Sequence, residues 1–165
     1  MWCAMTSTRA EPKSVKKDVI KLRARKPIKN VGFQQWRSAL VKSNAGARIK
    51  LVRAGVNASV LISASEYFAM PRAQFVKILG MSSATAERKI KSGSLLGQAE
   101  SERLERLALI EDVAEKVLGT ALLAREWLTR KNAALGESPI TMLDTETGAG
   151  EVRKVLYSIA YGGVV

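Results

Sequence analysis

Hydroxyl and basic side chains recur on one side of a predicted helix between residues 82 and 92. At 100° per residue, Thr85, Arg88 and Lys91 lie on that side, whereas Ala86 and Ile90 lie on the opposite side. Hydroxyl and guanidinium groups can hydrogen bond to base edges and phosphates, and the apolar side can pack on a scaffold. The segment therefore predicts a helix that reads the major groove of DNA.

The preceding residues predict another helix and a tight turn. Pro71 suits a first helical turn, and apolar residues follow it at helical spacing. Gly80 suits the end of that helix, and Ser82 or Ser83 can cap the next one by accepting a hydrogen bond from a free backbone N–H. We interpret residues 71–91 as a helix-turn-helix. The alternative is a plain helical hairpin with a solvated basic face.

Residue types that support catalysis or metal binding are scarce. The 165 residues include no histidine and one cysteine, Cys3, which excludes a His- or Cys-based zinc site, a His-assisted nucleophile and an internal disulfide. Six carboxylates fall between residues 100 and 115, but on one long helix they repel each other or are solvated, and none is opposed as an acid–base pair. We therefore expect no enzyme activity, no cofactor, no metal and no small-molecule substrate.

The chain also lacks signals for a membrane or for secretion. No apolar run approaches the roughly 20 residues that span a bilayer, and the first residues, MWCAM, are too short for a secretory signal. A single cysteine fits a reducing compartment. These features predict a cytoplasmic protein without a membrane partner.

The net charge of +12 is concentrated at the N-terminus. Residues 1–55 contain 14 lysines and arginines and two acidic residues, whereas residues 56–165 contain 13 of each sign. Because residues 1–30 lack a hydrophobic period and contain two prolines, we predict a basic, disordered arm that contacts DNA phosphates. The alternatives are a solvated tail without a specific partner and a mitochondrial transit peptide, against which the weak amphipathicity argues.

Helical periodicity continues through the rest of the chain and predicts an all-α fold. Residues 48–53 are ambiguous between a strand and a helical turn. A break at Gly119 divides the chain into a helix-turn-helix domain at 31–118 and a small helical domain at 119–165. The other expected helices lie at about 31–43, 121–130 and 138–143. Three more have two possible starts each: 57 or 59 to about 70, 98 or 99 to 118, and 145 or 147 to 161.

The long helix at 98–118 has an apolar stripe and a charged side. Glu102–Arg106 and Asp112–Lys116 are spaced as i,i+4 ion pairs on the solvated side. The expected stripe consists of Leu104, Leu107, Ala108, Ala114, Val117 and Leu118. The inward-facing residues expected in the C-terminal domain are Leu122, Leu123, Trp127, Leu128, Val152, Val155, Leu156 and Ile159.

Two motif blocks carry a family resemblance. The first runs Met81-Ser-x-x-Thr85-x-x-Arg88-Lys89-x-x-x-Gly93-x-Leu95, followed by Glu100-Ser101-x-Arg103-Leu104-x-Arg106-Leu107-Ala108. The second comprises Ala124-x-x-Trp127-Leu128, Asn132, Leu135-Gly136, Pro139, Leu143-x-Thr145-x-x-Gly148, Val152, Leu156, Ile159 and Tyr161-Gly162. With these two blocks, the chain resembles Xre/MbcA/ParS-type antitoxins, the partners of RES-domain toxins in bacterial toxin–antitoxin operons. The resemblance covers roughly residues 55–163 and leaves the basic arm outside.

The resemblance implies an Xre/Cro-like helix-turn-helix bundle followed by a toxin-binding domain, in a homodimeric antitoxin without enzyme activity. Such an antitoxin represses its own operon by binding operator DNA and neutralises a cognate toxin. RES toxins of this family degrade NAD⁺, and the antitoxin's C-terminal domain covers the toxin's active site. Lys89 falls on a motif position, and Ser83 is included for its place at the helix N-terminus. The DNA-contact candidates are therefore Ser83, Thr85, Arg88, Lys89 and Lys91.

Toxin-contact candidates come from the last predicted helix and the tail, where side chains remain free of the expected core. They are Arg153, Lys154, Tyr157, Tyr161, Gly162 and Val164. For the apolar motif residues, the competing interpretation is that they form the core of the C-terminal domain; these are Trp127, Leu128, Leu143, Val152 and Leu156. An alternative function is a helix-turn-helix transcriptional regulator without a toxin partner, whose C-terminal domain only dimerises.

Overall fold

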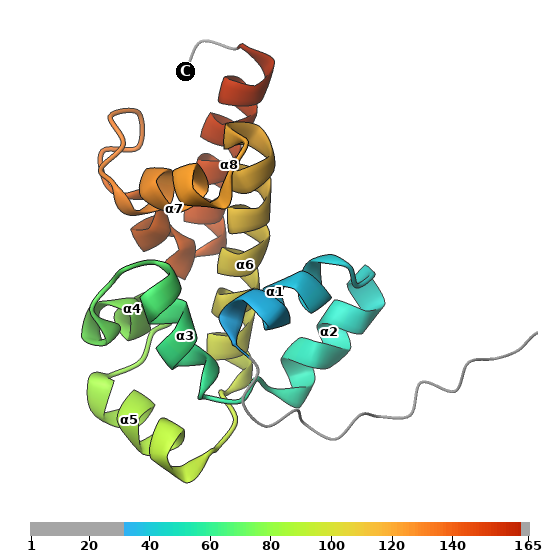
Figure 1. Cartoon of the computed structure of the whole chain (residues 1–165), viewed down its shortest axis with the longest axis vertical. Helices are drawn as coiled ribbons and strands as arrows, with labels where there is room; N and C mark the ends of the chain where they lie inside the picture. Colours follow the sequence, from blue (N-terminus) through green and yellow to red (C-terminus); the bar gives the residue numbers. More distant parts are fainter. Residues whose placement is uncertain (1–31, 163–165) are drawn as a thin grey trace, which may run out of the picture.

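A long helix, α6 (Gln98–Leu118), runs through the middle of the molecule, and the other helices pack around it (Figure 1). The structure is a computed structural model and describes residues 32–162. These residues are helical throughout, apart from turns and a single β-bridge between Asn57 and Leu95, which confirms the all-α prediction. The other helices are α1 (Phe33–Val41), α2 (Ala45–Ala54), α3 (Val60–Tyr67), α4 (Arg72–Ile78), α5 (Ser83–Ser92), α7 (Ala121–Thr129), the 3-10 helix η1 (Pro139–Asp144) and α8 (Glu146–Tyr161).

The helices divide into two groups along α6 (Figure 1). Helices α1 to α5 surround its N-terminal part, with α1 and α2 packed directly on it. Helices α7 and α8 pack on its middle and C-terminal part, whereas the short η1 lies beside Arg103 and Arg106 of α6 and also contacts α4. The predicted arm at residues 1–30 lies outside the described residues.

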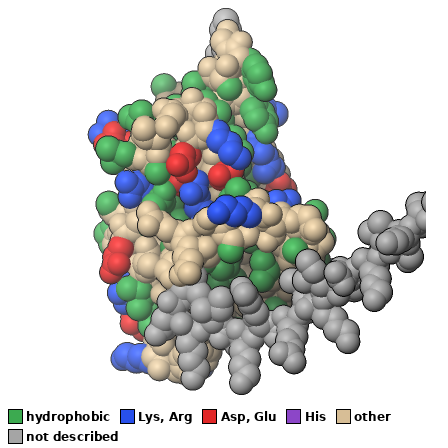
Figure 2. Space-filling view, turned by 45° about the vertical axis from the view of Figure 1, so that its right-hand side comes forward, with side chains coloured by type: hydrophobic (Ala, Val, Ile, Leu, Met, Phe, Trp, Pro, Cys, Tyr) green, Lys and Arg blue, Asp and Glu red, His purple; other side chains and the backbone are tan. Residues whose placement is uncertain are grey.

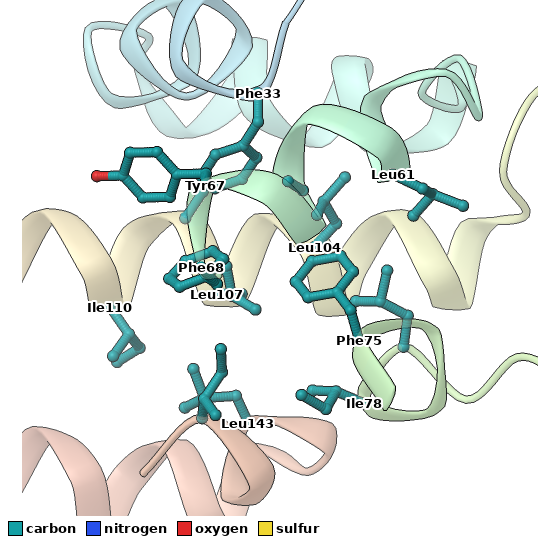
Figure 3. Close-up of a cluster of buried hydrophobic side chains, with 14 of the residues drawn as sticks. Phe33, Leu61, Tyr67, Phe68, Phe75, Ile78, Leu104, Leu107, Ile110 and Leu143 are labelled. Atoms are coloured by element: carbon teal, nitrogen blue, oxygen red, sulfur yellow. The ribbon is translucent and has the colours of Figure 1, made fainter. Parts of the chain in front are cut away.

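One hydrophobic core joins the two groups of helices (Figure 3). Helix α6 contributes Leu104, Leu107 and Ile110, each at most 1% exposed. The side chains labelled around them come from α1, α3, α4 and η1, and are Phe33, Leu61, Tyr67, Phe68, Phe75, Ile78 and Leu143. Gly119 ends α6 where the domain boundary was predicted, but buried residues on both sides of it belong to the same core. The division at 118/119 stays a prediction.

Side-chain caps explain where several helices begin. The ambiguous segment 48–53 is helical because Asn44 caps α2 by accepting a hydrogen bond from the Ala47 N–H at 2.9 Å. Thr145 caps α8 in the same way, accepting from the Gly148 N–H at 3.1 Å. Of the two predicted starts of the last helix, Thr145 and Thr147, the structure has Thr145.

Three apolar residues that were expected to face inward are exposed. Leu122 and Leu123 are 57% and 49% exposed, because the short helix α7 buries Ala124 and Leu128 instead, one turn apart. Ile159 is 45% exposed, since the last turns of α8 extend beyond the end of α6 (Figure 1). The other inward-facing residues predicted for α8 are buried, namely Val152, Val155 and Leu156.

One of the two ion pairs predicted on α6 is present in the structure. Asp112 and Lys116 form the predicted pair, with Nζ and Oδ2 2.6 Å apart. Arg106 does not pair with Glu102; its Nε lies 2.9 Å from Glu146 of α8. Arg106 also donates to the carbonyl of Leu143 at 3.0 Å, and Glu102 instead accepts a hydrogen bond from Gln98 at 2.8 Å.

Two sequence-based expectations concern membranes and metals. None of the helices in residues 32–162 is both long and apolar enough to cross a membrane. The same residues contain no cluster of three or more metal-ligating side chains.

Candidate recognition helix and C-terminal surface

The turn between α4 and α5 is held by backbone and hydroxyl hydrogen bonds. Gly80 adopts a φ of 73°, a left-handed conformation that favours glycine. Met81 is buried, and its N–H donates to the Val76 carbonyl at 3.0 Å. Ser82 caps α5: its hydroxyl accepts from the Thr85 N–H at 3.1 Å and donates to the Thr85 hydroxyl at 2.9 Å. The two helices are therefore joined as a helix-turn-helix requires.

The far end of α5 is fixed against the segment before α3. Asn57 donates its side-chain amide to the Gly93 carbonyl at 3.2 Å, and the Ala58 N–H donates to the Ser94 carbonyl at 3.0 Å. Along the helix, Ala86 is buried, and Ile90 packs against the core. Both ends and the inner side of α5 are thus anchored, which leaves its outer side for a ligand.

Not all five DNA-contact candidates lie on that outer side. Ser83, Arg88 and Lys91 are exposed, and no ion pair involves them among the described residues. Thr85 is half-buried and occupied by the Ser82 cap. Lys89 points toward α6, with its Nζ 3.6 Å from Glu100 and its side chain 20% exposed. The structure therefore leaves Ser83, Arg88 and Lys91 exposed on α5 and places Lys89 at the edge.

Positive charge is concentrated in the helices before α6, which include the recognition helix α5. Residues 32–99 contain ten basic residues and only two acidic ones, whereas residues 100–162 contain eight basic and eleven acidic residues. Lys50 and Arg53 of α2 are exposed, have no ion-pair partner among the described residues, and lie just before the loop that bonds the end of α5. Neither residue was among the predicted DNA contacts, although the sequence between residues 32 and 65 contains no acidic residue that could pair with them.

The C-terminal candidates lie along α8. Arg153 pairs with Glu146, two helical turns earlier in α8. Lys154 pairs with Glu151, with Nζ and Oε1 2.6 Å apart. Hydrogen bonds from Arg153 and from Arg106 hold the pKa of Glu146 below its usual value of 4.5, although partial burial opposes them. Arg153 and Glu146 also line an open groove of about 460 Å³ between α2, α6 and α8.

The aromatic candidates are exposed on the last turns of α8. Tyr157 is 48% and Tyr161 85% exposed, and their ring centroids lie 6.5 Å apart. They belong to the turns that project past α6, where hydrophobic side chains are visible at the surface (Figure 2). Gly162 is exposed at the helix end, and Val164 lies outside the described residues. The core interpretation holds for the buried Leu128, Leu143, Val152 and Leu156, while Trp127 is only half-buried.

Family models match both groups of helices. Residues 47–109 match the antitoxin Xre-like helix-turn-helix domain, and residues 113–162 match the antitoxin Xre/MbcA/ParS C-terminal toxin-binding domain. The two matches are adjacent and together cover about two thirds of the chain. The chain belongs to the Xre-type antitoxins. The family named from the motif blocks is therefore confirmed.

Similar proteins carry the same family name. An antitoxin Xre of Yersinia enterocolitica is 27% identical over 130 residues, which are 77% of this chain and 88% of that protein. An antitoxin Xre of Pseudomonas putida is 38% identical over 79 residues, which are 47% of this chain and 50% of that protein. An antitoxin Xre of Photorhabdus laumondii is 24% identical over 130 residues, with the same coverage as the Yersinia protein.

Helix α6 belongs to both domains of this Xre-type antitoxin, because one family match ends at residue 109 and the other begins at 113. Contacts across the boundary are numerous and polar. Arg125 of α7 donates to the Tyr67 carbonyl of α3 at 3.2 Å and lies over the Tyr67 ring, 4.6 Å from its centroid. The domains of the family are thus packed on each other in this chain.

A buried polar cluster at the same boundary was not predicted. Glu111 is 0% exposed; it accepts a hydrogen bond from the Tyr67 hydroxyl at 2.5 Å and pairs with Arg37 of α1. Burial raises the pKa of Glu111 above its usual value, and the contacts with Tyr67 and Arg37 oppose this only in part. The pKa of Tyr67 is also raised, by burial and by its hydrogen bond to Glu111. The prediction that the carboxylates of α6 are all repelled or solvated is wrong for Glu111, because Tyr67 of α3 donates to this buried carboxylate and Arg37 of α1 pairs with it.

Proposed function

We propose that this chain is the antitoxin of a cognate RES-domain, NAD⁺-degrading toxin in the bacterial cytoplasm. Its C-terminal domain covers the toxin's active site, and its helix-turn-helix binds operator DNA and represses its own operon. The protein acts as a homodimer and carries out no reaction itself. The observation that carries the proposal is that both family domains lie on one helix, with their free surfaces at different ends of the molecule.

The DNA-binding part is supported by the outer side of α5. Ser83, Arg88 and Lys91 are exposed there, and the surrounding helices carry a large excess of positive charge. Phosphate contacts from such cations contribute affinity, whereas a guanidinium can bind both acceptors of a guanine edge and so contribute specificity. Of the five candidates, we expect Arg88 to read a base and Lys89 to contact at most a phosphate.

The toxin-binding part is supported by the end of α8. Aromatic side chains that stay exposed next to polar ones are typical anchors of protein interfaces. Tyr157 and Tyr161 fit that role, and Arg153 and Lys154 lie within the same helix. The ion pairs of both basic residues with neighbouring glutamates are accessible, so a partner can replace them.

Co-purification tests the proposal. The chain is expressed with its neighbouring reading frame, only one of the two is tagged, and the mass of the complex is determined. We expect a stable complex that inhibits NAD⁺ cleavage by the partner and that is lost when Tyr157 and Tyr161 are both changed to serine. Leu51→Ser, an exposed apolar residue of α2 that is 41% accessible, is the matched control and should keep the complex.

Whole-domain truncation is a poorer test, because residues 121–165 contribute Leu128, Leu143 and Leu156 to the shared core. Recovery of a lone dimer that shifts its own promoter DNA would favour the alternative, a transcriptional regulator without a toxin partner. A complex that survives the double tyrosine substitution would move the toxin contact away from α8.

A further inference from the structure

The guanidinium of Arg103 contacts the turn of the helix-turn-helix and the C-terminal domain at once. Arg103 lies on α6; its Nη1 donates to the Leu79 carbonyl at 3.1 Å and its Nε donates to the Asp144 carbonyl at 3.2 Å. Gly80 leaves room for it, because a Cβ at that position would collide with Arg103 Nη1. The two carbonyls end α4 and η1, where backbone acceptors lack helical partners and favour a positive charge.

A series of polar contacts leads from Arg103 to the toxin-contact candidates. Arg106, one turn further along α6, donates to the Leu143 carbonyl at 3.0 Å and to the Asp144 carbonyl at 3.4 Å. Arg106 also pairs with Glu146, and Glu146 pairs with Arg153. Asp144 is therefore shared between two arginines of α6, and Glu146 between an arginine of α6 and one of α8.

The other end of this series is close to the recognition helix. Leu79 precedes the Ser82 cap of α5 by three residues, and the turn between them includes the left-handed Gly80. The short α4 packs directly on η1. A displacement of η1 relative to α6 would thus be transmitted to the turn through Arg103 and change how α5 presents its outer side.

We propose that Arg103 is a positioning residue for operator binding, through which the C-terminal domain sets the placement of α5. A toxin that engages Arg153 displaces its contact with Glu146, and the effect reaches the turn through Arg106, Asp144 and Arg103. Toxin and operator affinities are then coupled in one chain. This inference rests on the proposed function, since it needs both a toxin and an operator.

The test measures operator affinity of the full-length protein with and without saturating toxin, in the wild type and in Arg103→Ala. We expect the toxin to change wild-type operator affinity by about fivefold or more, the usual lower range of allosteric coupling, and toxin affinity to change by the same factor when operator is present. In Arg103→Ala we expect weaker operator binding without toxin and a coupling factor close to one.

Two further variants separate positioning from a general loss of charge or fold. Arg130→Ala removes a cation at the end of α7 whose only described ion pair is with Glu126 of the same helix, and it should keep the wild-type coupling. Arg103→Lys keeps the charge and a donor but cannot bridge two carbonyls in the fork geometry of arginine, so we expect reduced coupling with little change in melting temperature. It replaces Arg103→Ala if that variant does not fold.

Three results would overturn the inference. The first is a coupling between toxin and operator binding that is as strong in the Arg103 variants as in the wild type. A fall of about one in the salt slope of operator binding in Arg103→Ala is another, because it would identify a lost phosphate contact. The third is a wild-type coupling factor of one although both partners bind, which leaves the proposed function intact. Failure of either partner to bind at all would instead overturn the proposed function.

Discussion

Arg88 and Lys89 are adjacent in sequence but have different surroundings on α5. Arg88 is exposed without an ion-pair partner among the described residues, whereas Lys89 is directed toward Glu100 of α6. We expect Arg88→Ala to weaken operator binding by about 1–3 kcal/mol and to relax specificity at one base pair, because a bidentate contact to a guanine edge is lost. Titrations of operator and scrambled duplexes by fluorescence anisotropy measure both effects.

Lys89→Ala is the matched control for that experiment. It removes the same charge from the neighbouring position, and we expect a smaller loss that is similar on both duplexes. If Arg88→Ala weakened binding equally on operator and scrambled DNA, Arg88 would be a phosphate contact and the reading of bases would have to come from Ser83 or Lys91.

Glu146 is the residue whose ionisation depends most clearly on its partners. Because Arg153 and Arg106 lower its pKa below 4.5, the ionised form stabilises the folded state above pH 4.5, and this contribution disappears as the pH falls through the folded-state pKa. We expect an NMR titration of the Glu146 carboxyl to give a midpoint below 4.5 and to move upward in Arg153→Ala. Glu146→Gln should lose less stability than the wild type between pH 7 and pH 3.

Lys154→Ala is the control for the titration, since Lys154 pairs with Glu151 and not with Glu146. Its Glu146 midpoint should equal that of the wild type. A midpoint that stays in place in Arg153→Ala would show that Arg106 alone holds the carboxylate, and the contact series from α8 to α6 would then end at Arg106.

Among the helices, α8 offers a comparison between two glycines. Gly148 is buried in the first turn, where a Cβ would overlap with the Met142 carbonyl oxygen of η1; Gly150 has no atom within 4 Å of such a position. We expect Gly148→Ala to destabilise the protein by about 1–3 kcal/mol through overpacking against the backbone. Gly150→Ala should stabilise it by about 0.4–1 kcal/mol, because the unfolded chain loses freedom.

Urea unfolding followed by circular dichroism measures both glycine variants. Equal effects of the two substitutions would contradict the close approach of α8 to η1. The test also concerns function, because η1 provides the Asp144 carbonyl that Arg103 contacts.

Helix positions could be predicted from the sequence where caps and turn residues coincide with apolar periodicity. Gly119 marked the end of α6, and Ser82 and Thr145 are each one of two neighbouring caps that the sequence offered for α5 and α8. Where periodicity stood alone it was insufficient: adjacent leucines such as Leu122 and Leu123 cannot show which of them faces a partner, since that depends on how α7 crosses α6. The ambiguity at 48–53 had the same cause, and the Asn44 cap resolves it.

For the site, the sequence indicated α5 and α8 but not the contacts that connect them. The pattern of α6 alone suggested solvated charges, yet Glu111 is buried because Tyr67 and Arg37, far away in sequence, reach it. Arg103 likewise was noted only as a motif position, and its role depends on two carbonyls that lie 24 and 41 residues away. Side-chain spacing carries no information about such long-range partners.

At the scale of the whole molecule, positive charge continues from the helices into the arm. Residues 1–30 contain nine basic and two acidic residues, and the chain enters the described body at Gly32, next to the Phe33 N–H that donates to Ser63 of α3. Helix α3 begins beside Asn57, which bonds the end of α5. Gly32, to which residues 1–31 are joined, therefore belongs to the same group of helices as α5.

We expect deletion of residues 1–30 to reduce the salt dependence of operator binding more than its sequence specificity. Each phosphate contact that is lost should lower the slope of log affinity against log salt by about 0.9, while the difference between operator and scrambled duplexes stays close to that of the full chain. Binding isotherms at several salt concentrations measure both quantities. An unchanged slope would show that the arm does not touch DNA, and the charge excess that drives association would then have to come from the helices, with Lys50 and Arg53 of α2 as the residues to change next.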